Sequence, residues 1–217
     1  MSLRINDIAP DFTADTTEGP ISFHNWIGDG YAVLFSHPKD FTPVCTTELG
    51  MMAGMADQFA ARDAKIIGIS VDPVSDHHRW KHDIQSLTGN AVGYPMIGDP
   101  EMIVAKLYGM LPAEETRVDG RTPADNQTVR TVFIVGPDKK VKLNLTYPMT
   151  TGRNFDEILR ALDSIRLTAQ HQVATPAGWQ QGDDVIVTGA VTDEDALARF
   201  GGFDQKLPYL RTTKQPG

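Results

Sequence analysis

The stretch YAVLFSHPKDFTPVCTTELG, residues 31–50, contains a strand, a sharp connection and the start of a helix. Its first five residues form an apolar run typical of a buried strand, and the sequence SHP ends that run. Thr42 is a favourable N-cap residue, and Pro43 suits the first helical position because its missing N–H would be unpaired there anyway. Cys45 is therefore predicted to lie in the first turn of a helix that follows a strand.

The same alternation of strand and helix continues along the chain. The sequence KIIGISVD, residues 65–72, predicts a second buried strand. Further on, RTVFIV and VKLNLT predict a hairpin around GPDKK. Parallel strands joined by helices, with an antiparallel edge, indicate an α/β fold.

Helix boundaries are predicted from capping residues. Ser75 is expected to cap a helix whose apolar face includes Leu87. In DPEMIVAKLYG we expect Asp99 as the cap, Pro100 at the first helical position and Gly109 at the end.

The regular pattern weakens near residue 168. The segment VATPAGWQQGDDVIVTG is rich in turn residues and holds one short strand, and TDEDALARF predicts a short capped helix. We therefore expect a main domain at residues 1–167 and a small C-terminal extension at residues 168–217.

Composition excludes several classes of function. The chain has 217 residues, of which 41% are hydrophobic, and a formal net charge of −8. An acidic balance disfavours nucleic acid and membrane surfaces, which attract clustered Lys and Arg. The first residues lack the apolar segment of a secretory signal, and the apolar runs are too short to span a bilayer. A single cysteine allows no internal disulfide, so we expect a cytoplasmic protein.

Two interpretations of Cys45 remain open at this point. At a helix N-terminus, unpaired N–H groups and the helix dipole favour the nucleophilic thiolate over the thiol. A buried core residue is equally compatible, because cysteine is among the residue types most often buried.

The pattern around Cys45 resembles a known family. Pro38, Thr42 and Cys45 form P-x-x-x-T-x-x-C, and FSHPKDFTPVCTTELG resembles the active-site segment of the 1-Cys peroxiredoxins. The resemblance extends through SVDPVSDHHRWKHDI, VFIVGPDKKVKLNLTYPMTTGRNFDEILR and VATPAGWQQGDDV. It implies a thioredoxin-like fold and a C-terminal extension used in dimerisation.

The resemblance also implies roles for individual residues. Cys45 corresponds to the peroxidatic cysteine, Pro38 and Thr42 to its motif partners, and Arg130 to the arginine beside the sulfur. Glu48 and Arg153 correspond to a supporting pair, and His37 is expected to line the pocket.

The implied activity is a thiol-dependent, antioxidant peroxidase. The thiolate attacks one oxygen of hydrogen peroxide or an organic hydroperoxide and becomes a sulfenic acid, with no cofactor and no metal. Because the chain lacks a second cysteine, an external thiol or other small reductant must reduce the sulfenic acid. Pairing of the hairpin's edge strand with a second copy would give a homodimer, which can assemble further into a ring of dimers.

Other functions fit the sequence less well. His78 and His82 have the spacing of a zinc pair, but a third ligand is lacking, and His77 is expected to face the core instead. A serine hydrolase is disfavoured because GISVD lacks the final glycine of the nucleophile elbow. Gly30 stands where some relatives are credited with a lipase serine, beside His24 and Asp138 as its proposed partners. A redox sensor or an oligomeric holdase remains an alternative.

Overall fold

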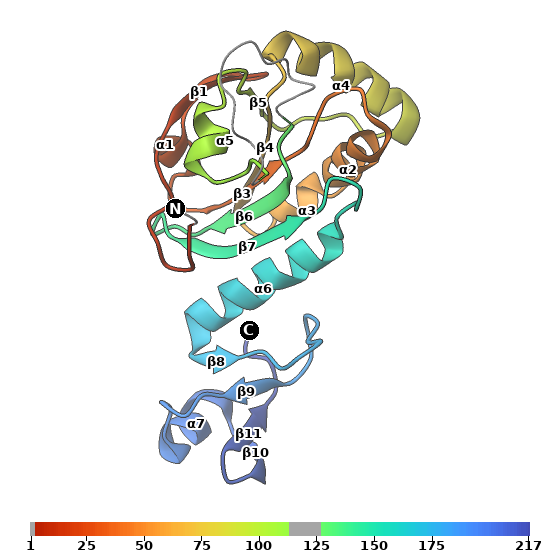
Figure 1. The fold of residues 1–217 in the computed structure, drawn as a ribbon. Coiled ribbons are helices and arrows are strands. Elements are labelled where there is room, and N and C mark those ends of the chain that lie inside the picture. Colours follow the sequence, from red (N-terminus) through yellow and green to blue (C-terminus); the bar gives the residue numbers. More distant parts are fainter. Residues whose placement is uncertain (1–2, 113–126) are drawn as a thin grey trace. The chain divides into compact units, whose positions relative to one another are not determined.

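The computed structural model describes residues 3–112 and 127–217. The chain divides into two compact units, Met1–Phe155 and Asp156–Gly217, and each is described here by itself (Figure 1). Among the described residues, every helix is too short or too polar to cross a membrane.

A seven-stranded sheet forms the centre of the first unit. Its strand order is β2-β1-β5-β4-β3-β6-β7. The central strands β3, β4 and β5 are parallel, and the strands on either side of them run antiparallel to their neighbours. This confirms the predicted α/β fold, which is thioredoxin-like, with its antiparallel hairpin at one edge. The strands are β1 (Thr13–Thr16), β2 (Gly19–Ser22), β3 (Tyr31–Ser36), β4 (Ala64–Ser70), β5 (Met96–Gly98), β6 (Arg130–Val135) and β7 (Val141–Tyr147).

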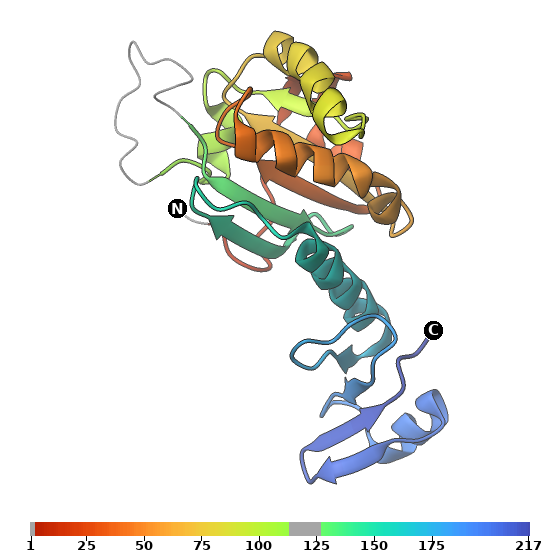
Figure 2. The same ribbon diagram turned by 90° about the vertical axis from the view of Figure 1, so that its right-hand side faces the viewer.

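Helices cover both faces of this sheet (Figures 1 and 2). Side chains alternate along a strand, so Leu34 packs with Phe23 and Tyr108 on one face, while Phe35 contacts Tyr94 on the other. The first face is covered by α1 and α5, and α2 and α4 lie side by side on the second (Figure 2). The helices are α1 (Phe23–Ile27), α2 (Pro43–Gly54), α3 (Ala56–Ala60), α4 (Val74–Thr88) and α5 (Ile103–Leu107).

The connection from β3 to α2 has the predicted geometry. Thr42 occupies the N-cap with extended backbone angles, and Pro43 is the first helical residue. The preceding Phe41 has φ +55°, which turns the chain sharply into the helix. The Thr42 hydroxyl donates to the Lys39 carbonyl at 2.8 Å, and the Thr46 N–H donates to the Thr42 carbonyl at 2.9 Å. Local sequence therefore places Cys45 in the first turn.

Two predictions for α4 were wrong. The helix begins at Val74 with Pro73 at the N-cap, so Ser75 lies inside its first turn. Leu87 is 68% exposed, although Trp80 and Ile84 of the same helix are buried. Leu87 lies in the last turn, where the helix extends beyond the core that covers its middle.

The predicted first residue of α5 was also wrong, although the predicted capping residue, Asp99, was correct. The helix begins at Ile103 rather than at Pro100, because Met102 adopts a left-handed conformation with φ +58°. The Asp99 carboxylate nevertheless accepts the N–H groups of Ile103 and Ala105, at 2.8 and 2.7 Å. Asp99 thus caps the helix from four residues ahead, and Gly109, with φ +63°, follows its end as predicted.

The hairpin of β1 and β2, the helix α1 and the short strand β5 were not predicted. The hairpin segment TADTTEGPIS is polar and lacks the apolar alternation that marks a strand with one buried face. The hairpin joins the central sheet through the pair of Thr16 with Ile97 of β5, two residues that lie far apart in the sequence.

The second unit contains a long helix, a small sheet and a short helix. Its sheet has the order β10-β11-β9-β8. The Thr192 hydroxyl accepts the Asp195 N–H at 3.1 Å, which confirms the predicted capped helix. The predicted extension at residues 168–217 lies entirely within this unit. Its elements are α6 (Phe155–His171), β8 (Val173–Ala174), β9 (Val185–Val187), α7 (Asp193–Phe200), β10 (Asp204–Leu207) and β11 (Leu210–Thr213).

Candidate active site

Cys45 lies in the first turn of α2, beyond the carboxyl end of β3, and is fully buried. Arg130 is the first residue of β6, which pairs with β3 in the sheet. The Arg130 Nη1 donates to the Cys45 Sγ at 3.3 Å. The only thiol of the chain therefore lies at the start of a helix and accepts a hydrogen bond from a permanently charged guanidinium.

Glu48 holds two buried arginines beside the sulfur. It follows Cys45 by three residues on α2, so the two side chains lie on the same part of the helix surface. The Glu48 carboxylate accepts from Arg130 Nη1 at 2.6 Å and from Arg153 Nε and Nη2 at 2.9 and 2.8 Å. Burial by itself would raise the pKa of Glu48, but the bonds and charge of Arg153, with the charge of Arg130, lower it below its usual value.

The backbone fixes both guanidinium groups. Arg130 Nε donates to the Met149 carbonyl at 2.8 Å. Arg153 Nη1 donates to the carbonyls of Ser36 and Thr131, at 2.7 and 3.1 Å. With two arginines and one glutamate, this cluster has a net positive charge that offsets the negative charge of a thiolate at Cys45.

The remaining predicted site residues lie in the β3–α2 connection. Pro38 is buried there, Thr42 begins α2, and His37 directly follows β3. The structure therefore brings Cys45, Glu48, Arg130 and Arg153 into one hydrogen-bonded cluster, and places Pro38 and Thr42 in the loop that leads to it. His37 belongs to a second cluster.

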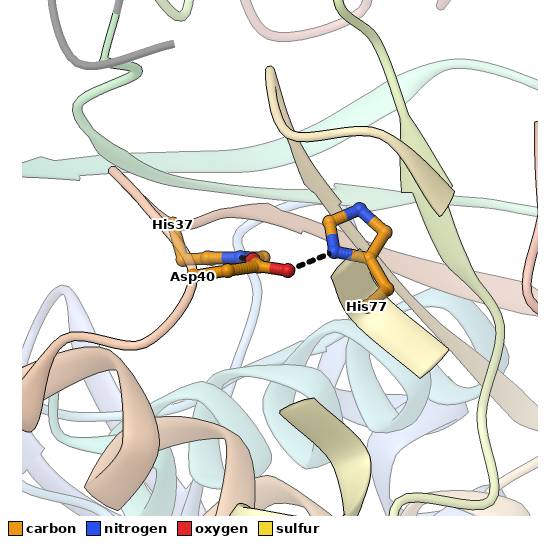
Figure 3. A group of neighbouring side chains, drawn as sticks. All are labelled: His37, Asp40 and His77. Atoms are coloured by element: carbon orange, nitrogen blue, oxygen red, sulfur yellow. Dashed lines mark hydrogen bonds and ion pairs between the residues drawn. The ribbon is translucent and has the colours of Figure 1, made fainter. Parts of the chain in front are cut away.

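Asp40 lies between two histidines in that second cluster (Figure 3). Its Oδ1 is 2.7 Å from His37 Nε2, and its Oδ2 is 2.5 Å from His77 Nδ1. The Asp40 N–H donates to Asp72 Oδ2 at 2.9 Å, and the Ser70 hydroxyl donates to the same oxygen at 2.8 Å. All of these groups lie at or just beyond the carboxyl ends of β3 and β4 or at the start of α4, the edge where open α/β sheets bind ligands.

The geometry of this cluster is that of hydrogen bonds rather than of metal ligands. The three candidate ligand atoms lie within 4.8 Å of one another. Two ligands of one tetrahedral zinc ion are about 3.3 Å apart, given metal–ligand bonds of about 2.0–2.1 Å. The distances of 2.5 and 2.7 Å are shorter and match charge-assisted hydrogen bonds.

Sequence reasoning located only part of this second cluster. His77 is buried, as predicted, and His78 and His82 are exposed. The part played by Asp40 and Asp72 was missed. Their positions near the carboxyl ends of predicted parallel strands were the available signal, because such strands end at the same edge of a sheet.

A cavity of about 460 Å³ opens at the start of α2. It is lined by the end of the β3–α2 connection, the first turns of α2 and one face of α4, and Phe41 and Leu87 in its lining are 49% and 68% exposed. Its lining is Phe41, Thr42, Pro43, Thr46, Thr47, Trp80, Asp83 and Leu87.

The residues that correspond to the lipase positions credited to some relatives have other hydrogen-bond partners in this structure. His24 Nε2 is bonded to the Ala9 carbonyl at 2.7 Å, and Asp138 pairs with Lys142. At Gly30, a β-carbon would lie 2.6 Å from the Asp63 carbonyl oxygen, so a serine side chain requires the backbone to shift.

Comparison with known proteins agrees with this geometry. The model of the AhpC/TSA family matches residues 5–144, and that of the C-terminal domain of 1-Cys peroxiredoxin matches residues 164–202. Peroxiredoxin-6 of Gallus gallus is 49% identical to this chain, and the match covers 99% of this chain and 98% of that protein. The mitochondrial peroxiredoxin PRX1 of Saccharomyces cerevisiae is 47% identical over 98% of this chain and 81% of its own length.

Solved structures show the same fold. A cysteine-to-serine variant of peroxiredoxin 6 from Arenicola marina matches with a TM-score of 0.91 at 45% identity, over 99% of each chain. The yeast mitochondrial 1-Cys peroxiredoxin matches with a TM-score of 0.88 at 47% identity, over 98% of this chain and 99% of that one.

A thiol at a helix N-terminus, paired with an arginine on a thioredoxin-like fold, defines a thiol-dependent peroxidase. Among such enzymes, the chain belongs to the AhpC/TSA family and, with its C-terminal unit, to the 1-Cys peroxiredoxins.

Proposed function

We propose that Cys45 is the peroxidatic cysteine and that Arg130 activates it. The observation that carries this proposal is the Arg130 Nη1, which donates to the Cys45 Sγ at 3.3 Å. The thiolate attacks the hydroxyl oxygen of a hydroperoxide, an S–O bond forms and the O–O bond breaks. The electron pair leaves with the second oxygen, which takes a proton from water to give water or an alcohol, and Cys45 becomes a sulfenic acid.

The other site residues hold this pair in place. Arg130 and the N–H groups of the first turn stabilise the negative charge that develops on the leaving oxygen. Glu48 and Arg153 orient Arg130. The Thr42 hydroxyl donates a hydrogen bond to the Lys39 carbonyl, so we assign to Thr42 the role of shaping the first turn. The buried Pro38 shields the sulfur from water.

We propose an external thiol as the reductant. The chain has one cysteine, so a second sulfur must come from another molecule. The structure of the yeast mitochondrial relative is described as showing thiol resolution through the glutathione and thioredoxin systems. A reducing compartment supplies such thiols, which supports a cytoplasmic location for this chain, although one relative is named as mitochondrial.

The reductant is tested by following hydrogen peroxide consumption with a panel of thiols. Without a thiol, the purified protein is expected to consume about one equivalent of peroxide per chain and stop. With glutathione, or with thioredoxin and its reductase, consumption should continue over many cycles. A single equivalent under every condition would favour the redox sensor over the enzyme.

We also propose that the protein forms homodimers, which can assemble further into rings. Strand β7 lies at the end of the seven-stranded sheet, so part of its backbone is available for pairing with a second copy. The second unit exposes apolar side chains that suit an interface, with Tyr209 82%, Leu197 56% and Leu207 44% exposed.

Light scattering at micromolar concentration tests the assembly. We expect a mass of at least twice the 23.8 kDa of one chain. Replacing Leu145 on β7 by proline should reduce that mass, because proline disrupts strand pairing. Ser86→Ala, at an exposed position of α4, is the control variant and should keep the wild-type mass. A wild-type mass of one chain would refute the proposal.

A further inference from the structure

Both ring nitrogens of His77 lie beside hydrogen-bond acceptors. Its Nε2 lies 3.0 Å from the Ile97 carbonyl oxygen, and a carbonyl can only accept a hydrogen bond. Its Nδ1 lies 2.5 Å from Asp40 Oδ2. Burial by itself would raise the pKa of Asp40, but the bonds from His37 and His77 lower it to about 2, so Asp40 is a carboxylate and accepts. Both nitrogens of His77 therefore face hydrogen-bond acceptors, a geometry that is satisfied when both nitrogens donate.

His37 is held differently. Its Nε2 donates to Asp40 Oδ1 at 2.7 Å, while its buried Nδ1 has no hydrogen-bond partner within residues 3–112 and 127–217. Burial lowers the pKa of His37, which keeps this ring neutral despite the opposing effect of Asp40. A neutral ring with its proton on Nε2 has a lone pair on Nδ1, and a buried lone pair without a partner is costly unless a bound group donates to it.

The His37 ring is linked through Trp80 to the first turns of α2, the helix that carries Cys45. It packs on Trp80 with ring centroids 5.2 Å apart, and the Trp80 indole N–H reaches the Thr46 hydroxyl at 3.3 Å. Thr46 is the neighbour of Cys45. On the other side, the carbonyl of Ser36, next to His37, accepts from Arg153 of the charged cluster.

We propose that Asp40 and His77 are positioning residues of the peroxidase site, which keep His37 Nδ1 as a hydrogen-bond acceptor for the hydroxyl group of the bound hydroperoxide. This inference rests on the proposed peroxidase role of Cys45. His77 neutralises Asp40, and Asp40 in turn orients the His37 ring and keeps the ring proton on Nε2. These three residues thus form a positioning network rather than a metal site, and His37 is the member that contacts the substrate.

The proposed bond is compatible with the chemistry at Cys45. The hydroxyl oxygen of the hydroperoxide is the atom that the thiolate attacks, and its hydrogen remains on it in the sulfenic acid product. The bond to Nδ1 therefore orients the oxygen before attack and persists afterwards, and no proton is transferred to His37. An acceptor fixed in one tautomer avoids the cost of reorienting during the reaction.

The first test is a measurement of the ring protons without any reaction. Histidine ¹⁵N chemical shifts of the full-length protein should show His37 with its proton on Nε2 and an unprotonated Nδ1, and should show His77 protonated on both nitrogens. In His77→Gln and in Asp40→Asn, His37 should show a mixture of the two tautomers. Finding the His37 proton on Nδ1 in the wild-type protein would overturn the proposal.

The second test is the rate constant for the reaction of Cys45 with hydrogen peroxide, per folded molecule. We expect His77→Gln and Asp40→Asn to lower it on the order of ten- to a hundredfold, by analogy with the loss of a partner that orients a metal-ligating histidine. His78→Gln, an exposed neighbour on α4, is the matched control and should react at the wild-type rate.

The outcomes separate this inference from the proposed function. If the wild-type Cys45 does not react with peroxide, the peroxidase proposal itself fails. If the wild-type protein reacts and the folded His77→Gln and Asp40→Asn variants match His78→Gln in rate, only the positioning role is refuted. Variants that do not fold leave the ¹⁵N measurement on the wild-type protein as the deciding result.

Discussion

Replacing Cys45 by serine is expected to abolish peroxide consumption with every reductant. The rate should fall at least about a thousandfold, as is found when a catalytic nucleophile is removed. A serine hydroxyl beside Arg130 stays protonated at neutral pH, so it cannot replace the thiolate as the nucleophile. The chain has no other thiol to substitute for Cys45. The measurement is the initial rate of hydrogen peroxide loss with glutathione present.

This variant should remain folded, which makes the loss of activity interpretable. Serine is close to cysteine in size, and its hydroxyl can accept the hydrogen bond that Arg130 Nη1 donates to Cys45 Sγ. Ser86→Ala, at an exposed position of α4, should retain the wild-type rate. Substantial peroxide turnover by folded Cys45→Ser would show that the reaction occurs elsewhere in the chain.

The parts of the site that could be predicted from residues alone are local in sequence. Thr42, Pro43 and Cys45 are neighbours, so the start of a helix and the place of the thiol follow from capping and from the fixed φ of proline. Arg130 and Arg153 approach the thiol and Glu48 from 85 and 105 residues away, and only the family resemblance indicated them. Without the family resemblance, we would interpret Arg130 as an ordinary surface arginine.

The His37–Asp40–His77 network shows a second limit. Its members follow β3 or begin α4, and His77 also bonds Ile97 of β5, so the network depends on which strands are neighbours in the sheet. Periodicity in the sequence predicts that these strands exist but not their order. The same limit explains β5 itself, which has three residues and is recognisable only from its pairing with β4.

Replacing Arg130 by methionine is expected to lower the rate of the peroxide reaction on the order of a hundred- to a thousandfold. Methionine keeps the apolar length of the side chain but removes the positive charge and the donors. The thiolate at Cys45 loses the group that stabilises it, and the leaving oxygen loses a preorganised donor, which is an effect of this size in other enzymes. Stopped-flow measurement of the reaction with hydrogen peroxide gives the rate, and the pH dependence of alkylation gives the thiolate fraction.

The neighbouring residues should tolerate this change. Glu48 loses the 2.6 Å bond from Arg130, but its carboxylate still accepts three bonds that the backbone N–H, Nε and Nη2 of Arg153 donate, so it is not left unpaired. The Arg130→Lys variant separates the effect of the positive charge from the effect of the guanidinium geometry. A lysine retains the positive charge, but its compact ammonium lacks the planar fork that serves Cys45, Glu48 and the Met149 carbonyl together.

We therefore expect Arg130→Lys to be faster than Arg130→Met and slower than the wild-type protein, with an alkylation midpoint nearer to that of the wild type. Arg4→Met, in which the replaced side chain is 82% exposed, is the control for loss of a positive charge and should react normally. If folded Arg130→Met reacts with peroxide at the wild-type rate, the helix N-terminus by itself activates Cys45. The 3.3 Å contact between guanidinium and sulfur would then be a feature of packing, and the charged cluster would serve to hold α2 against β6 rather than to promote the reaction.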